Sequence, residues 1–109
     1  QLLQSTANIR QAIAYIQAHL SENLTLEEIA RQCHMSKFYL SHQFTQTQAS
    51  SLSKYILKSR ITKSMRLLRE TLMSVKEIAE AVGFNDVAYF CRAFKAEAGM
   101  TPLQYRKQN

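Results

Sequence analysis

The sequence predicts an all-α protein of about seven helices, built from one helical motif used twice, with a long helix between the two copies. The 109 residues include only two glycines and one proline, which is too few turn residues for a β-sandwich or barrel. Apolar residues recur at the spacing of helices through most of the chain. A chain of this length can bury a hydrophobic core without disulfides or a metal.

The first half of the chain predicts three helices. A helix is expected over about 8–21, because apolar residues from Ile9 to Leu20 recur at helical spacing. A second, short helix follows Thr25 and Glu28, which have the spacing of a capping box, and ends near residues 33–34. Ser36 can cap a third helix.

The second half predicts four more helices. Residues from Ser51 to about 68 form a helical segment with apolar stripes. Ser74 and Glu77 repeat the capping box, and a further helix is expected near 86–98. Gly99 is expected to end that helix, and Thr101-Pro102 to start a last short one.

The two halves repeat the same pattern. Ile29-Ala30 matches Ile78-Ala79 at an offset of 49 positions, whereas Phe44 matches Phe94 at an offset of 50. One residue has therefore been inserted at the second turn, and the agreement indicates an internal duplication. We expect a first subdomain over 1–50, a linker helix over 51–70 and a second subdomain over 71–109.

Each copy has the features of a helix-turn-helix motif. The small Ala30 or Ala79 lets two helices approach closely, and a tight turn joins them. Gly83 supplies a permissive backbone in the second turn. His34 takes its place in the first, where it can adopt a positive φ. Ala49 stands where the second copy has Gly99, so the helix before it is expected to end less easily in a left-handed residue.

The positive charge is concentrated in one part of the chain. The formal net charge of +6 comes from 14 Lys and Arg against 8 Asp and Glu, and residues 1–50 sum to zero. Six basic residues and no acidic residue lie between Lys54 and Arg69. Such a run favours a polyanionic partner, although a solvated helix face would look the same.

Several classes of protein are disfavoured. Cys33 and Cys91 do not make a disulfide framework, and no apolar run reaches the roughly 20 residues of a membrane span. We therefore expect a cytoplasmic protein with no membrane partner. The spacing of Cys33, His34 and His42 matches no zinc pattern. No phosphate loop or nucleophile elbow is present, so we expect neither a cofactor nor catalysis.

The chain resembles the DNA-binding domain of the AraC/XylS family of bacterial transcription regulators. The resemblance is strongest over Val75-Lys-Glu-Ile-Ala-Glu-Ala-Val-Gly-Phe-Asn-Asp-Val-Ala-Tyr-Phe-Cys-Arg-Ala-Phe-Lys and over Gly99-Met-Thr-Pro-Leu-Gln-Tyr-Arg. It covers about residues 9–107. It implies transcription regulation through double-stranded DNA, more often as an activator, and hence contact with RNA polymerase. Ser64 departs from the family pattern, which usually has Ala there.

The two helices near 36–47 and 86–98 are expected to enter successive major grooves. Leu40 and Phe44 face inward in the first, and Tyr89, Phe90 and Phe94 are expected in the core of the second. The side chains that face outward form the predicted base-reading set: Phe38, Ser41, His42, Thr45, Val87, Ala88, Cys91 and Arg92. For Phe38, Ser41 and His42, the resemblance itself implies base contacts.

Phosphate contacts are expected from basic side chains and helix N-termini. The predicted set is Ser36, Lys37, Lys54, Lys58, Lys63, Asn85, Lys95 and Lys107. Arg60 and Arg106 match family positions for which we expect mixed structural and electrostatic roles.

Two further expectations concern the longer protein and an alternative function. It begins with Gln1 rather than Met, so we expect an effector-binding or dimerisation segment to precede it in a longer protein. The alternative function is a helical protein-interaction module, which would have an apolar groove-facing surface and weak salt dependence.

Overall fold

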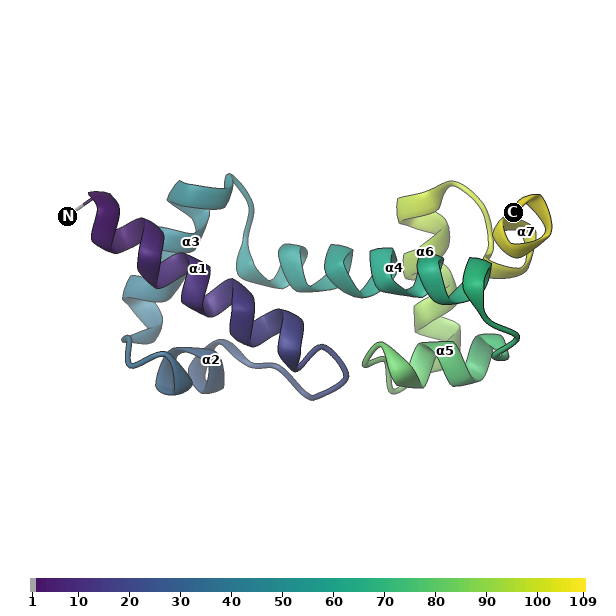
Figure 1. Ribbon diagram of the computed structural model, residues 1–109, viewed down its shortest axis with the longest axis horizontal. Helices are drawn as coiled ribbons and strands as arrows, with labels where there is room; N and C mark the ends of the chain where they lie inside the picture. Colours follow the sequence, from purple (N-terminus) through teal and green to yellow (C-terminus); the bar gives the residue numbers. More distant parts are fainter. Residues whose placement is uncertain (1) are drawn as a thin grey trace. The chain divides into compact units, whose positions relative to one another are not determined.

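The computed structural model describes residues 2–109, with side chains described from residue 4 onwards, and these residues contain helices and no β-strand. The helices are α1 (Leu2–Ala18), α2 (Leu26–Gln32), α3 (Lys37–Gln48), α4 (Leu52–Glu70), α5 (Val75–Ala81), α6 (Val87–Ala98) and α7 (Pro102–Gln108) (Figure 1). The predicted all-α fold of seven helices is confirmed.

The first helix differs from its predicted bounds of 8–21. The predicted start is too late because residues 4–8 carry no apolar periodicity. In the structure, Ser5 and Asn8 of this stretch contact the hydroxyl of Tyr39 in α3. The helix ends earlier because His19 donates its backbone N–H to Ile16, three residues back rather than four.

The chain forms two compact units, Gln1–Leu57 (unit 1) and Lys58–Asn109 (unit 2). The helix expected between the two copies is the continuous α4, which passes from one unit into the other. Its first turns contribute Leu52 and Ile56 to the core of unit 1, whereas Ile61 and Leu68 are buried in unit 2. Thus α4 is the last helix of unit 1 and the first helix of unit 2.

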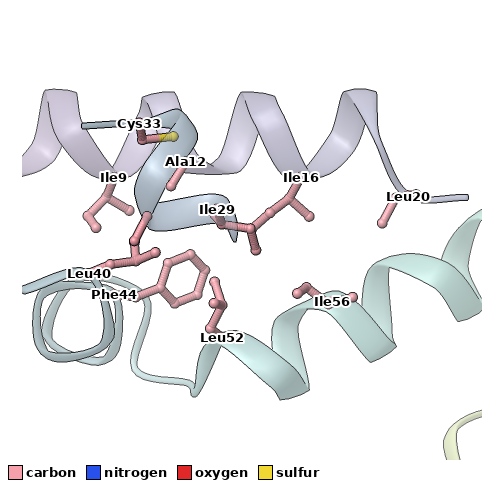
Figure 2. Close-up of a cluster of buried hydrophobic side chains, with 11 residues drawn as sticks. Ile9, Ala12, Ile16, Leu20, Ile29, Cys33, Leu40, Phe44, Leu52 and Ile56 are labelled. Carbon is pink, nitrogen blue, oxygen red and sulfur yellow. The ribbon is translucent and has the colours of Figure 1, made fainter. Parts of the chain in front are cut away.

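The core of unit 1 is assembled from all four of its helices (Figure 2). The ring of Phe44 is fully buried and meets the ring of Tyr55 edge-on at 5.3 Å. Truncating such a residue costs about 3–5 kcal/mol. The buried side chains come from these four helices and from the residues just after α1 and α2: Ile9, Ala12, Ile16, Leu20, Ile29, Ala30, Cys33, Leu40, Phe44, Leu52 and Ile56.

The core of unit 2 is built around a row of aromatic rings. Phe84 and Phe90 lie 5.0 Å apart, and Phe90 and Phe94 lie 5.9 Å apart. Phe94 meets Tyr105 of α7 edge-on at 5.6 Å, as Phe44 meets Tyr55 in unit 1. Such edge-to-face contacts are favourable, so an aromatic pair holds α7 against α6 as another holds α4 against α3.

The duplication extends further than the predicted helix-turn-helix motifs. The second part of α4 repeats α1 at an offset of 52 positions, so that buried Ile61 and Ser64 stand where Ile9 and Ala12 stand in unit 1. Ser64, which departs from the family pattern, is fully buried and its hydroxyl donates to the backbone oxygen of Ile61 at 2.6 Å. Each unit is therefore a copy of one four-helix arrangement.

Four residues with left-handed backbone conformation follow α2, α3, α5 and α6. His34 has φ of 58° and Gly83 has φ of 103°, as predicted for the two turns. Ala49 also adopts φ of 56°, matching Gly99 at 80°, so alanine does not prevent the left-handed ending. Its N–H bonds to the oxygen of Thr45 at 2.9 Å, which compensates part of the backbone cost.

The two predicted capping boxes have different outcomes. Ser74 and Glu77 form a complete box at the start of α5. In α2, Thr25 accepts from the N–H of Glu28 at 3.1 Å, but that carboxylate does not complete the box. It binds Arg31 at 2.7 Å instead, because a charged donor one turn along the helix competes with the backbone N–H.

Candidate nucleic-acid interface

In unit 1, α3 presents one exposed face. Ser36 caps the helix by accepting from the N–H of Tyr39 at 3.1 Å. Leu40 and Phe44 are buried, so helical spacing turns the other face outward. The predicted side chains Phe38, Ser41, His42 and Thr45 are all exposed on α3.

The chemistry of this face is mixed. Phe38 is 77% exposed, which is unusual for a large apolar side chain and suits contact with a thymine methyl group. The imidazole of His42 and the hydroxyl of Ser41 offer hydrogen bonds to base edges. Thr45 donates its own hydroxyl to the oxygen of Ser41 at 3.1 Å, which leaves its lone pairs and methyl group for contact.

Tyr39 fixes α3 from behind. Its phenolic oxygen accepts from the side-chain amide of Asn8 at 3.0 Å and lies 3.5 Å from the hydroxyl of Ser5. These two hydrogen bonds lower the pKa of Tyr39 below its usual value. The contacts tie the first turn of α3 to α1, and the exposed side chains on that turn are therefore anchored.

In unit 2, α6 is the corresponding helix. Asp86 is its N-cap and accepts from the N–H of Ala88 at 2.9 Å. Val87, Ala88 and Arg92 are exposed, and Cys91 is partly exposed, as expected for the predicted set. Among these side chains Arg92 has the strongest hydrogen-bonding capacity, because its guanidinium can bind guanine or phosphate.

The expectation that Tyr89 lies in the core is wrong. Its side chain is 48% exposed, because the buried stripe of α6 runs through Phe90 and Phe94. The ring centres of Tyr89 and Phe84 lie 5.7 Å apart, and the guanidinium of Arg92 lies 6.0 Å from the ring centre of Tyr89. An aromatic ring and a cation therefore share this face of α6.

Sequence reasoning therefore missed two residues of this face, Tyr89 and Asp86. The signal for Tyr89 was its match to Tyr39 at an offset of 50 positions, since neither position falls on the buried stripe. The signal for Asp86 was the same offset from the cap Ser36. Asn85, predicted as a phosphate contact, is the inserted residue, exposed and just outside the cap.

The predicted phosphate-binding side chains are divided between the units. Ser36, Lys37 and Lys54 belong to unit 1, and the remainder belong to unit 2. All are exposed except Lys63, which is partly buried. The unit 2 members are Lys58, Lys63, Asn85, Lys95 and Lys107.

Lys37 is engaged within unit 1. Its ammonium group lies 3.6 Å from a carboxylate oxygen of Glu27 in α2 and 5.4 Å from the ring centre of Phe38. A phosphate that binds Lys37 therefore competes with Glu27.

Arg60 and Arg106 of unit 2 are both partly buried. Arg106 donates to the backbone oxygens of Leu68 at 3.1 Å and Thr71 at 3.3 Å, and thereby ties α7 to the end of α4. Arg60 is partly buried, and desolvation lowers its pKa, while the nearby hydroxyl of Tyr89 acts in the opposite direction.

The described residues offer little support for other kinds of site. Within residues 2–109, no group of three or more His, Cys, Asp or Glu side chains is placed to hold a metal ion. Cys33 is buried among apolar side chains, and desolvation raises the pKa of its thiol. No helix in this part of the chain is long and apolar enough to cross a membrane.

Comparison with known proteins identifies the family. Residues 29–108 match a helix-turn-helix domain family. The chain is 32% identical over 102 residues to the regulatory protein PocR of Salmonella typhimurium, covering 94% of this chain and 34% of PocR. It is 32% identical over 102 residues to the Msm operon regulatory protein of Streptococcus mutans, covering 94% of this chain and 37% of that protein.

Solved structures agree with this match. The C-terminal domain of AraT, a response regulator from Geobacillus stearothermophilus, superposes with a TM-score of 0.90 at 39% identity, covering 94% of this chain and 85% of that one. The DNA-binding domain of AdpA, a global transcriptional factor solved with a target DNA, has a TM-score of 0.87 at 25% identity, covering 92% and 90%.

The chain spans about a third of the length of most of the first curated relatives that it matches. Those relatives are transcriptional regulators, and the shared part contains both helix-turn-helix motifs. The chain belongs to the AraC-type helix-turn-helix family of DNA-binding transcription regulators.

Proposed function

We propose that this chain binds double-stranded DNA sequence-specifically, with α3 and α6 lying in successive major grooves. The observation that carries the proposal is that each unit buries one stripe of a 12-residue helix after a left-handed turn and exposes the opposite face. A helix of that kind fits the major groove of B-DNA, whose width of about 12 Å admits an α-helix.

The base-reading roles are divided between the units. In unit 1, His42 and Ser41 hydrogen-bond to base edges, while Phe38 packs on a thymine methyl group and Thr45 supports contact further along α3. In unit 2, Arg92 binds guanine or phosphate, and Val87, Ala88 and Cys91 make apolar contacts. Unit 1 thus supplies more of the hydrogen-bonded specificity, because its exposed face offers more polar side chains.

The phosphate-binding role falls mainly on unit 2. The predicted lysines of that unit are exposed or partly exposed, and Ser36 and Asn85 lie at the starts of the two recognition helices. Contacts of this kind position a protein on the duplex without reading its sequence. Tyr89 joins them, because its exposed ring and the neighbouring Arg92 face the same side of α6.

The cellular role proposed is activation of transcription in a bacterial cytoplasm. Contact with RNA polymerase follows from activation. The family membership supports the regulatory role, and AdpA, solved with a target DNA, supports the choice of partner.

Selection of bound sequences tests the central claim. The chain is mixed with random-sequence duplex DNA, bound duplexes are separated by electrophoretic mobility, and several rounds yield a preferred site. We expect a site with two separated blocks of preferred bases. Failure to retain any duplex at low salt would contradict DNA binding and would favour a protein-interaction module.

Groove occupancy is tested on the selected site. Methylation of guanine N7 marks the major groove, and we expect interference in two blocks about one helical turn apart. Inserting five base pairs between the blocks should abolish tight binding, because it moves one block to the other side of the duplex. Unchanged affinity after the insertion would contradict simultaneous binding by α3 and α6.

A further inference from the structure

We propose that Glu27 competes with DNA phosphate for Lys37 and thereby weakens the hold of unit 1 on DNA. The inference rests on the proposed DNA-binding function and adds to it a side chain that lowers affinity. Glu27 does not touch DNA bases in this proposal; it acts through Lys37.

The ion pair lies where α3 begins. The Lys37 ammonium is 3.6 Å from the Glu27 carboxylate, and both side chains are accessible, at 46% and 67%. Lys37 directly follows the cap residue Ser36 and is the only Lys or Arg of α3, which has no acidic residue. Glu27 therefore neutralises the one permanent positive charge on the predicted recognition helix of unit 1.

The neighbouring carboxylate does not share this role. Glu28 is bound to Arg31 at 2.7 Å and to Gln32 at 2.9 Å, so its charge is satisfied within α2. Those hydrogen bonds and the Arg31 guanidinium lower the pKa of Glu28. Of this acidic pair, Glu27 is the residue that reaches α3.

Unit 2 has the opposite charge at the matching position. The residue 49 positions after Glu27 is Lys76, and the residue 50 positions after Lys37 is Val87. Lys76 and Val87 line one cleft at the start of α6, together with the carboxylates of Glu80 and Asp86. A basic side chain thus lies beside the recognition helix of unit 2 where unit 1 has a carboxylate.

The size of the effect follows from Coulomb's law. A phosphate in contact with Lys37, at about 4 Å, would lie about 7 Å from the Glu27 carboxylate, and the repulsion weakens binding by about three- to eightfold at low salt. Because Lys37 is already paired, its contact with phosphate also releases little counterion. The salt dependence should therefore become steeper when Glu27 is neutralised.

The experiment measures binding to random-sequence duplex at several salt concentrations. For Glu27→Gln we expect about three- to eightfold tighter binding at low salt and a log–log salt slope steeper by up to about 0.9. Glu22→Gln is the matched control, since it removes the same charge from an exposed residue of unit 1 outside α2 and α3. Thermal unfolding of both variants confirms that they are folded.

Second-site changes identify Lys37 as the mediator. Lys37→Gln should weaken binding only slightly in the wild-type chain, but should cancel the gain of Glu27→Gln when the two are combined. Lys76→Gln should weaken binding and make the salt slope shallower, because in residues 2–109 its ammonium forms no ion pair with the carboxylates of its cleft.

The outcomes separate this inference from the proposed function. If the wild-type chain binds DNA but Glu27→Gln behaves like Glu22→Gln, the competition is overturned. It is equally overturned if the gain persists after Lys37→Gln. If the wild-type chain binds no duplex, the proposed function itself fails.

Discussion

At the scale of single residues, the proposed sequence specificity rests on a few exposed side chains that a buried stripe positions. Phe38 and His42 are exposed on α3, while Leu40 between them in sequence is buried. Substitutions on the exposed face should therefore change DNA recognition with little effect on folding, because surface changes away from caps and cores cost little stability.

His42→Ala should alter sequence preference. Loss of its hydrogen bond should relax discrimination at one or two base pairs by about fivefold to tenfold, because one such bond is worth about 1 kcal/mol. The measurement is a comparison of selected sequence profiles for the variant and the wild-type chain. Gln11→Ala, at an exposed position of α1, is the control, and identical profiles for all three proteins would exclude base reading by His42.

Exchanging alanine and glycine at positions 49 and 99 should change the free energy of unfolding in opposite directions. Gly99→Ala should cost about 1 kcal/mol, because φ is +80° although there is open space for the added methyl group. Ala49→Gly should gain about 0.5 kcal/mol, since relief of the left-handed strain is partly offset by the greater flexibility of the unfolded chain. Chemical denaturation measures both, and a loss of stability in Ala49→Gly would show that position 49 is not strained.

At the scale of elements, the helices are fixed by caps and turns that are largely readable in the sequence. The positions of α2, α5 and their following turns were predictable because capping residues and the left-handed His34 and Gly83 are local signals. The start of α1 was not, because residues 4–8 show no apolar periodicity and their contacts are with Tyr39, which is distant in sequence.

The same distinction explains what was predictable of the site. The outward set on α3 follows from the spacing of Leu40 and Phe44 alone. The exposure of Tyr89 and the pairing of Lys37 with Glu27 depend on neighbouring helices. Likewise, the role of α4 as the first helix of unit 2 appears only when its contacts are known, although the offset of 52 positions was present in the sequence.

The capping box of α5 should make stability depend on pH. Hydrogen bonds from Ser74 lower the pKa of Glu77 below its ordinary value of 4.5. The carboxylate therefore stabilises the fold above pH 4.5, and this contribution is lost as the pH falls through the lowered folded-state pKa. Glu77→Gln keeps an acceptor for the backbone N–H but cannot titrate.

The measurement is thermal unfolding of the two proteins between pH 7 and pH 3. We expect the wild-type chain to have the higher Tm at pH 7 and the difference to shrink as the pH falls below 4.5. A difference that is the same at both pH values would show that the charge of Glu77 does not contribute to the cap.

At the scale of the whole molecule, the two cores determine how the chain unfolds, and the uneven charge distribution determines how it attracts a polyanion. Each unit buries its own aromatic and aliphatic side chains, and α4 contributes to both. The net charge of +6 lies largely in unit 2, so electrostatic attraction to a polyanion is expected mainly there.

Binding to DNA should fall steeply with salt. If about six phosphates are neutralised, the logarithm of affinity should fall with the logarithm of salt concentration with a slope of roughly −5. Titrations of a labelled duplex at several potassium chloride concentrations measure the slope. A flat dependence would argue for an apolar interface and against phosphate contacts.

Loss of one core should spare the other unit. Phe44→Ala should cost about 3–5 kcal/mol in unit 1, which is most of the stability expected of so small a unit. Hydrogen exchange should then lose protection in α1, α2 and α3 while α5, α6 and α7 stay protected. Phe94→Ala should give the reverse pattern, and uniform loss in either variant would mean that the units unfold together.

The continuity of α4 has a consequence for exchanging parts between relatives. The border between the units at Leu57 and Lys58 falls inside a helix, so no loop is available as a junction. A chimera of two such proteins must therefore be joined within α4, where backbone hydrogen bonds between residues four apart link the two parental segments. A junction of that kind also has to preserve two hydrophobic faces at once. We therefore expect whole two-unit chains to recombine far more successfully than single units.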